Sequence, residues 1–255
     1  AQIFITSHSP TITAKTDLKK LIVLQTQDDV ITPFCFSNLG EEDFSNKNRN
    51  HLKKFLDVTK SQLFFANGII LVEGLSESLL LPALSKNILG YDLETYGIEI
   101  VNINGVAFEH FAKLFNNTNP SKQLLSKCAL ITDSDPTDSM QMSDRALKAE
   151  GLEYGNLRVR LASKSFEYDL FQESEKNKDF IRHVYQSMHP KTEELKDEFD
   201  VEIFWERLDK KIKDKGDFAL SLLSKIEECD QDKFDVPTYI KDAVEWVVKK
   251  DNNVL

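Results

Sequence analysis

Four acidic residues follow two apolar stretches of the chain at spacings that suit the binding of metal ions. Glu73 follows one apolar run directly, and Glu77 comes shortly after it, beyond a glycine. Asp133 and Asp135 follow a second apolar run. Carboxylates that lie together need cations or hydrogen bonds to stay ionised, because like charges raise each other's pKa. Ligands that are all oxygen suit Mg²⁺ or Mn²⁺, so the pattern predicts a centre for two such ions.

The first pair of acids belongs to an expected strand–turn–helix unit. The run Ile69–Val72 is apolar and mostly β-branched, which predicts a strand buried on both faces. After Gly74 the apolar residues recur at helical spacing, so the period changes there. Glu73 therefore ends a strand, at the edge where open α/β sheets bind ligands. Glu77 falls in the first helical turn, where an ordinary helix start explains it equally well.

The second pair extends the strand expected over 128–132. Two aspartates at positions i and i+2 of a strand point the same way, and Pro136 stops the strand directly after them. Aspartates also favour turns, so a plain turn is the alternative explanation. If the strands are parallel, the right-handed crossover rule places Glu73 and both aspartates at one edge of one sheet. We therefore expect all of these acids to converge.

Further elements complete an alternating α/β pattern. We expect strands over 98–103 and 157–161, with a helix that begins at Phe108 between them. Glu167 and Asp169 follow the last strand and either hold metal or begin a helix capped by serine. From about residue 173 the chain is helical and highly charged, and the expected helices are 175–188, 197–213, 217–228 and 237–250. The basic run 210–215 is either a solvated face or a contact for DNA phosphates.

Composition narrows the class of protein. The 255 residues are 41% hydrophobic and 29% charged, as in ordinary soluble proteins. Runs of about 18 apolar residues are absent, which excludes a membrane-spanning helix. Three dispersed cysteines and the lack of a signal peptide predict a cytoplasmic protein. The net charge of −10 argues against a general nucleic-acid-coating protein but allows a metal-dependent nuclease.

The first residues suggest a piece of a longer protein. Residues 2–6 are predicted to form a buried strand, which opens without an initiator methionine. The following Thr-Ser-His8-Ser-Pro is similar to the switch-histidine loop of ABC-type ATPases, although a structural histidine is the alternative. Residues 37–50 are polar and are expected to form a loop or linker. The chain has no glycine-rich phosphate loop, so ATP would bind only through an upstream domain.

Together these motifs resemble the OLD (overcoming lysogenization defect) family of ATP-dependent nucleases. The order Leu-Val-Glu73-Gly, strand, helix and Asp133-Ser-Asp135 is similar to the Toprim fold of topoisomerases, primases and related nucleases. Other segments that carry the resemblance are 56–66, 165–170, 215–219 and 236–243. Gabija-type defence nucleases share the arrangement of an ABC-type ATPase ahead of a Toprim domain.

The resemblance implies an α/β Toprim fold, with a mostly parallel central sheet and flanking helices. It also implies four divisions of the chain. These are the C-terminal end of an ABC-type ATPase domain (1–40), a linker or connecting helix (41–66), the Toprim catalytic core (67–172) and a helical C-terminal part (173–255).

The resemblance further implies a metal-dependent DNA endonuclease that nicks or cleaves by a two-metal mechanism, in an ATPase–nuclease of anti-phage defence. The residues implied as metal ligands are Glu73, Glu77, Asp133, Asp135 and Glu167. Lys215 corresponds to the catalytic lysine of the family, and His8 to a nucleotide-binding residue of the ATPase. The expected partners are DNA, further copies of the chain in a dimer or tetramer, and a UvrD-like helicase as in Gabija.

The sequence leaves three alternative functions open. A haloacid-dehalogenase-like phosphatase also uses Asp-x-Asp, but its aspartates lie on the opening strand, with no Val-Glu-Gly strand before them. A topoisomerase or primase would share the acids but needs further machinery. A non-catalytic module that binds DNA or dimerises an ATPase is the third alternative.

Overall fold

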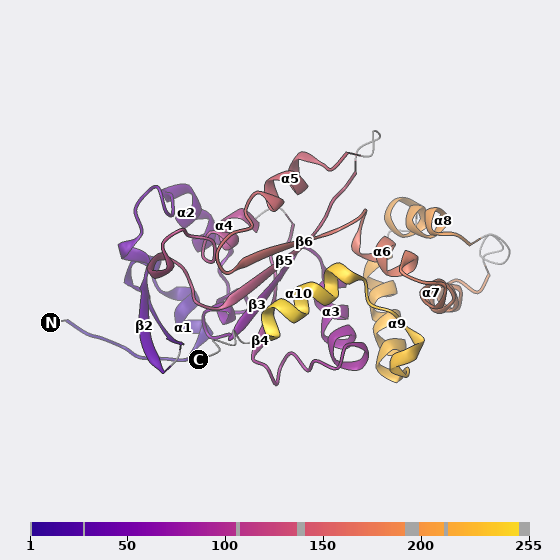
Figure 1. The fold of residues 1–255 in the computed structure, drawn as a ribbon, viewed down its shortest axis with the longest axis horizontal. Helices are drawn as coiled ribbons and strands as arrows, with labels where there is room; N and C mark the ends of the chain where they lie inside the picture. The colour runs from indigo at the N-terminus through magenta and orange to yellow at the C-terminus, as the bar shows by residue number, and fades with distance from the viewer. Residues whose placement is uncertain are drawn as a thin grey trace, which may run out of the picture.

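The computed structural model describes residues 2–27, 29–105, 108–136, 141–191, 199–211 and 214–249. Its elements are spread along the longest axis of the molecule, and the last helix returns to the middle (Figure 1). A hairpin with short helices occupies one end, a parallel sheet the middle, and a group of helices the other end.

The central sheet has four strands in the order β4-β3-β5-β6, and every neighbouring pair is parallel. The strands are β3 (Gly68–Val72), β4 (Ile98–Asn102), β5 (Lys127–Asp133) and β6 (Leu157–Ala162). All five residues of β3 are buried, as the apolar run predicts for a strand covered on both faces. Because the strands are parallel, their carboxyl ends share one edge of the sheet, and Asp133 pairs there with Ala162.

One face of the sheet is covered by α3 (Leu75–Ala83) and by α10 (Thr238–Val248). Ile70 and Val72 of β3 and Ile131 of β5 point into this layer. The predicted apolar stripe of α10 packs here, with Ile240 and Val244 fully buried. A single turn of π-helix (Leu84–Ile88) continues α3.

The opposite face packs against the N-terminal half of the chain. Ile69 and Leu71 of β3 point into this second core. Its elements are α4 (Phe108–Ala112), α5 (Asp144–Glu150), α2 (Asn46–Phe55), a 3₁₀ helix (Lys60–Phe64) and the antiparallel hairpin of β1 (Ile22–Gln27) and β2 (Val30–Cys35). The segment expected as a linker, 41–66, thus contributes buried residues to the core of the sheet, and the domain divisions stay a prediction.

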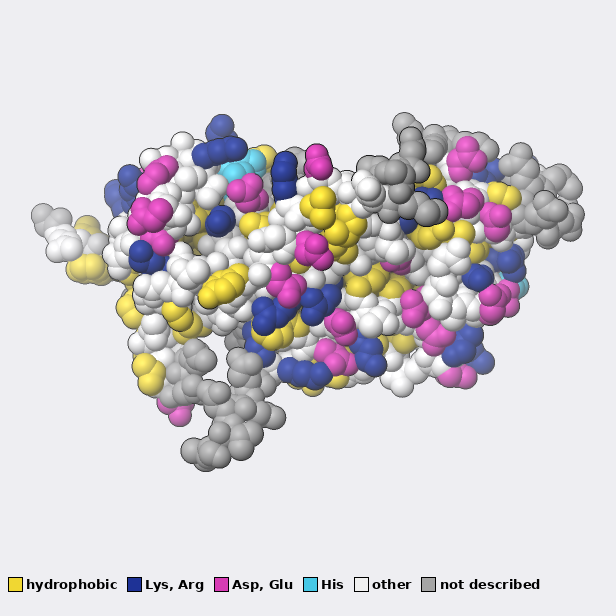
Figure 2. All heavy atoms as spheres, turned by 45° about the horizontal axis from the view of Figure 1, so that its top comes forward, with side chains coloured by type: hydrophobic (Ala, Val, Ile, Leu, Met, Phe, Trp, Pro, Cys, Tyr) yellow, Lys and Arg dark blue, Asp and Glu magenta, His cyan; other side chains and the backbone are white. Residues whose placement is uncertain are grey.

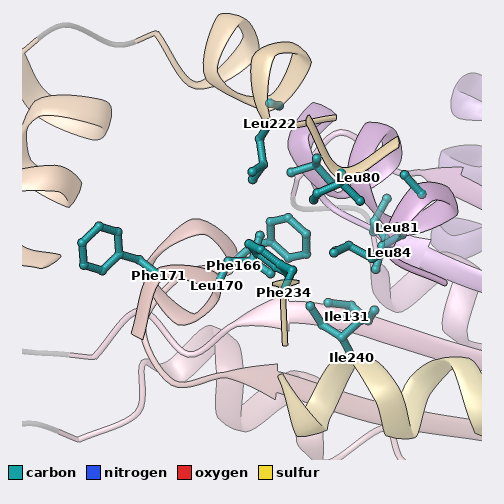
Figure 3. Packing of buried hydrophobic residues seen from close by; sticks show 14 of the residues in the cluster. Leu80, Leu81, Leu84, Ile131, Phe166, Leu170, Phe171, Leu222, Phe234 and Ile240 are labelled. Atoms are coloured by element: carbon teal, nitrogen blue, oxygen red, sulfur yellow. The ribbon is translucent and has the colours of Figure 1, made fainter. Parts of the chain in front are cut away.

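The helical end of the molecule contains α6 (Phe166–Gln172), α7 (Glu175–Met188), α8 (Val201–Glu206) and α9 (Lys215–Glu228). These helices continue the core on the α3 side of the sheet. Figure 3 shows Phe166 of α6 beside Phe234, with Leu84 and Ile131 close by. The packing fixes α6 and α9 relative to the carboxyl edge of the sheet, where the acids lie.

The structure differs from the sequence expectations at the start of the chain, in the loop expected over 37–50, and in the helix expected over 197–213, whose described part is α8 followed by a π-helical turn (Arg207–Lys211). Residues 2–6 form no strand, and Ile3, Phe4 and Ile5 are 76–79% exposed. Apolar side chains favour a strand, but a strand also needs a neighbour to pair with, and the described residues supply none there. Part of the expected loop 37–50 is the start of α2, capped by Ser45. A further helix, α1 (Pro10–Lys15), follows the N-terminal stretch.

Candidate active site at the carboxyl edge of the sheet

Glu73 follows the last residue of β3 and has a partner on each carboxylate oxygen. Thr132 of β5 donates a hydrogen bond from its hydroxyl to Oε1, and the Arg145 guanidinium pairs with Oε2. The Glu73 side chain is 12% exposed. The Glu73 side chain is therefore largely buried between the ends of two neighbouring strands and α5, at the edge where a parallel sheet binds ligands.

Glu77 lies in the first turn of α3 and is buried, with 7% of its surface exposed. Burial, followed by the negative charge of Glu167, raises the pKa of Glu77 from 4.5 to about 7. A Cβ placed on Gly74 would lie 2.6 Å from Glu77 Oε2. The backbone of Gly74, with a φ of −130° and a ψ of 175°, is open to any residue, so a side chain there would act by displacing the Glu77 carboxylate.

Asp133 is the last residue of β5, and its Oδ1 accepts a hydrogen bond of 3.0 Å from the backbone N–H of Phe166. Burial raises the pKa of Asp133 well above its usual range, and the charges of Glu77, Glu167 and Asp135 raise it further. Burial and the neighbouring carboxylates therefore favour the protonated form of Asp133 unless positive charge is added to the site.

The second aspartate of the Asp-x-Asp motif is not on the strand. Asp135 has a φ of +42°, a left-handed conformation that aspartate tolerates better than most residues. The expected same-side geometry of positions i and i+2 on a strand is therefore wrong, because β5 ends at Asp133. Asp135 still faces the site, where its Oδ2 lies 3.3 Å from Arg145 Nη1.

Glu167 and Asp169 both begin α6, as the helix-start alternative predicts, and Ser165 caps this helix by accepting from the N–H of Tyr168. The side chains of Glu167 and Asp169 have different surroundings. Glu167 is buried, with 4% exposed, and faces the acidic site. Asp169 Oδ2 accepts a 2.6 Å hydrogen bond from the N–H of Ser163, so this carboxylate orders the loop between β6 and α6.

Lys215 is the first residue of α9 and brings positive charge from the helical end of the molecule. Its Nζ lies 3.7 Å from Glu167 Oε2 and 3.1 Å from Asp209 Oδ1. Burial lowers the pKa of Lys215, but the carboxylates of Glu167 and Asp209 outweigh that effect and raise it. The lysine is therefore held as a cation at the edge of the acidic site.

His8 is not brought to the acids. It is exposed, and its ring centroid lies 6.2 Å from that of Phe65. The N-terminal stretch that contains it begins at the opposite end of the molecule from α6–α9 (Figure 1). Of the basic run 210–215, residues 212 and 213 lie outside the described residues.

Two residues of the site were not expected from the sequence. Arg145 lies in the first turn of α5, a helix whose Ser143 cap and terminal Gly151 were available as signals. Tyr239 of α10 has a buried hydroxyl with no hydrogen-bond partner among the described residues. Burial raises the pKa of Tyr239 well above its usual value, and the charges of Asp169, Asp133 and Glu77 raise it further. This hydroxyl is an orphaned polar group beside the acids.

The acids divide into two groups by their partners. Glu77, Asp133 and Glu167 repel one another and have Lys215 as their nearby cation. Glu73 and Asp135 share Arg145. The described residues include no three His, Cys, Asp or Glu side chains already arranged as a metal cage. The oxygen-only chemistry and the unbalanced negative charge fit divalent ions, and the acids would have to exchange present partners for them.

A family model for the Toprim domain of proteins like overcoming lysogenization defect protein matches residues 64–135. Those residues form an OLD-like Toprim domain. The Toprim domain includes four of the five candidate metal ligands, Glu73, Glu77, Asp133 and Asp135. Glu167 and Lys215 lie beyond the matched residues.

Comparisons of structure confirm the expected Toprim fold. The C-terminal region of the Burkholderia pseudomallei OLD protein matches with a TM-score of 0.56 and 24% identity, covering 72% of this chain and 98% of that one. The C-terminal region of the Xanthomonas campestris pv. campestris OLD protein gives a TM-score of 0.51 and 21% identity, covering 73% and 94%. Both similarities are similarities of fold.

A curated relative is similar across most of the chain. Endonuclease GajA from Bacillus cereus (strain HuB5-5) is 25% identical over 262 residues, which cover 89% of this chain. The matched part is 38% of the length of that relative. The chain therefore spans less than half of the length of this relative.

Proposed function

We propose that this chain is the catalytic part of a metal-dependent DNA endonuclease that cuts phosphodiester bonds with the help of two Mg²⁺ or Mn²⁺ ions. One observation carries the proposal. Five carboxylates from β3, α3, β5, the turn after β5 and α6 face one edge of the sheet, and three of them, Glu77, Asp133 and Asp135, have a raised pKa. The similarity to a relative named as an endonuclease supports it.

In this proposal each group of acids holds one ion. Glu77, Asp133 and Glu167 would provide one set of oxygen ligands, and Glu73 with Asp135 the other. When bound, the ions would supply an activated water and would neutralise charge on the leaving oxygen. Side chains of the protein would position the phosphate and stabilise its charge.

Lys215 would bind the phosphate that is cut. Its ammonium lies at the border of the acidic site, 38% exposed, so a non-bridging phosphate oxygen can approach it from solvent. A cation held there stabilises negative charge that builds on the phosphate during cleavage. Asp209 and Glu167 fix its position from either side.

Contacts with DNA would be local. On the face in Figure 2, Lys and Arg side chains are interspersed with Asp and Glu, and the coloured residues form no continuous basic surface there. The net charge of −10 agrees with this mixture. Divalent ions at the acids would therefore account for much of the local attraction to the phosphate backbone.

The wider setting is inferred from the resemblance to OLD and Gabija proteins. We propose that the whole protein acts in the cytoplasm in anti-phage defence, as a dimer or tetramer, with an ATPase domain and a UvrD-like helicase as partner. His8 would contact the nucleotide of that ATPase domain. None of the helices in the described part of the chain is both long and apolar enough to span a bilayer.

The test measures cleavage of supercoiled plasmid and of linear DNA by the full-length protein in Mg²⁺ or Mn²⁺. Asp133→Asn and Glu73→Ala should abolish cutting without unfolding the protein, whereas Asp232→Asn, an exposed aspartate of the helical part, should leave it unchanged. Equal cutting by all variants would show that these acids are not the active site. Relaxed circles that are resealed would instead indicate a topoisomerase.

A further inference from the structure

We propose that Arg145 is a built-in cation that occupies the Glu73–Asp135 half of the site and must leave before a divalent ion binds there. The inference rests on the proposed function, because it concerns the filling of the same site. It makes Arg145 a positioning residue that decides how tightly the second ion binds.

The contacts of Arg145 point directly to this role. Its two terminal nitrogens divide between the carboxylates of Glu73 and Asp135, one to each. Glu73 follows β3 and Asp135 follows the neighbouring strand β5, so a single fork-shaped cation bridges the ends of two strands much as a metal ion would. Its Nε is buried and has no hydrogen-bond partner among the described residues.

The present partners of Glu73 compete with an ion for its carboxylate while this arrangement persists. One carboxylate oxygen has the Thr132 hydroxyl as donor and the other has Arg145. A guanidinium and a divalent ion on the same carboxylates would repel each other strongly at short range. Binding of the ion therefore requires Arg145 to turn away, and its 33% exposed side chain lies close enough to solvent to do so.

The other half of the site has no such competitor. Lys215 contacts only Glu167 among the candidate ligands, at 3.7 Å, and its shorter contact is with Asp209. The structure therefore predicts two classes of metal binding, a tighter one at Glu77, Asp133 and Glu167 and a weaker one at Glu73 and Asp135.

The test is a titration of the full-length protein with Mn²⁺ alone. Binding is measured by calorimetry and by the electron paramagnetic resonance signal of the free ion. The wild type should bind in two phases. Arg145→Gln removes the charge, so the weaker phase should tighten roughly tenfold, the factor expected when a charged hydrogen-bonded partner is lost. The same variant should also melt at a lower temperature in EDTA, because Glu73 and Asp135 then lack their cation.

Arg160→Gln is the matched control. Arg160 is similarly half-buried at 26% exposure and pairs with Glu153 at 3.2 Å. Its buried Nε has no hydrogen-bond partner among the described residues and lies 3.8 Å from Asp242 Oδ2. It contacts none of the candidate ligands, so its loss should leave both phases unchanged. If Arg145→Gln fails to fold, Arg145→Lys keeps a charge but loses the fork, and should tighten the weaker phase by a smaller factor, roughly threefold.

The outcomes separate the two proposals. An Arg145 variant that binds Mn²⁺ with the wild-type isotherm overturns the role of Arg145 while leaving the nuclease proposal standing. A wild type that binds no Mn²⁺, with Asp133→Asn behaving identically, overturns both. Tightening in Arg160→Gln equal to that in Arg145→Gln would show a general effect of lost positive charge and would also overturn the inference.

Discussion

The ammonium of Lys215 lies 3.7 Å from Glu167, so the helical end of the molecule completes the site that the sheet begins. Lys215 starts α9 and Glu167 starts α6, and the side chains meet because both helices pack against the same core. The acids at the sheet edge thus gain a cation from an element that follows the Toprim domain.

Lys215→Ala should abolish most cleavage while the protein stays folded and still binds Mn²⁺. The lysine would stabilise charge on the phosphate, and loss of one such contact costs about 100-fold or more in rate. Single-turnover nicking of plasmid measures the effect. Lys225→Ala, an exposed lysine of the same helix paired with Glu228, is the control. Wild-type cutting by Lys215→Ala would remove the lysine from the site.

The pKa of Glu77 predicts how the metal-free protein responds to pH. Folding raises this pKa from 4.5 to about 7, so the folded state prefers the protonated carboxyl. The associated stabilisation is complete below pH 4.5 and is lost as the pH rises through about 7. Asp133, whose pKa is also raised, acts in the same direction.

In EDTA, the wild type should therefore lose melting temperature between pH 5 and pH 7.5 more steeply than Glu77→Gln, which cannot ionise there. The comparison is the difference between the two melting curves, and Glu150→Gln, an exposed glutamate, should follow the wild type. Parallel curves for wild type and Glu77→Gln would contradict the pKa of Glu77.

Gly74→Ala should damage the site and leave the fold intact. The backbone of Gly74 accepts any residue, but the new Cβ would lie 2.6 Å from Glu77 Oε2 and force that carboxylate to move. We expect weaker Mn²⁺ binding and slower cleavage with a nearly unchanged melting temperature. Gly151→Ala is the control, because its Cβ would meet no atom closer than 3.4 Å.

Asn177 tests the helical end without touching the acids. It is fully buried, its amide nitrogen donates to the carbonyls of Leu170 and Asp235 at 2.7 and 2.8 Å, and its oxygen accepts from the N–H of Asp235. Asn177→Ala removes the partner of one buried and two partly buried backbone groups, so unfolding by urea should show a loss on the order of 3 kcal/mol. A loss below about 1 kcal/mol would mean that water replaces the amide.

Local patterns predicted most of the fold and the placement of the acids. The strands from β3 to β6 were found because buried parallel strands read as unbroken apolar runs, and their carboxyl ends then had to share one edge. The helices α7, α9 and α10 followed from apolar periodicity. Convergence of Glu73 with Asp133 needed only this topology.

Contacts between side chains could not be predicted in the same way. The pairing of Arg145 with Glu73 depends on how α5 lies against β5 and β6, which periodicity does not encode. The left-handed turn at Asp135 follows from chain reversal after β5, and only the tolerance of aspartate for that conformation was visible in the sequence. Tyr239 lies within segment 236–243, which carries the family resemblance. The burial of its hydroxyl, however, could be seen only in the structure.

The last helix of the described chain, α10, lies over β3, β5 and β6 and buries Ile240 and Val244 against them. Protein synthesis therefore delivers the cover of the central strands after all five candidate metal ligands and Lys215. A message cut short before this helix would yield chains whose sheet stays open and apolar, the kind of product that cellular proteases remove. For an enzyme proposed to cut DNA, incomplete synthesis thus leads to clearance and not to a partly assembled nuclease.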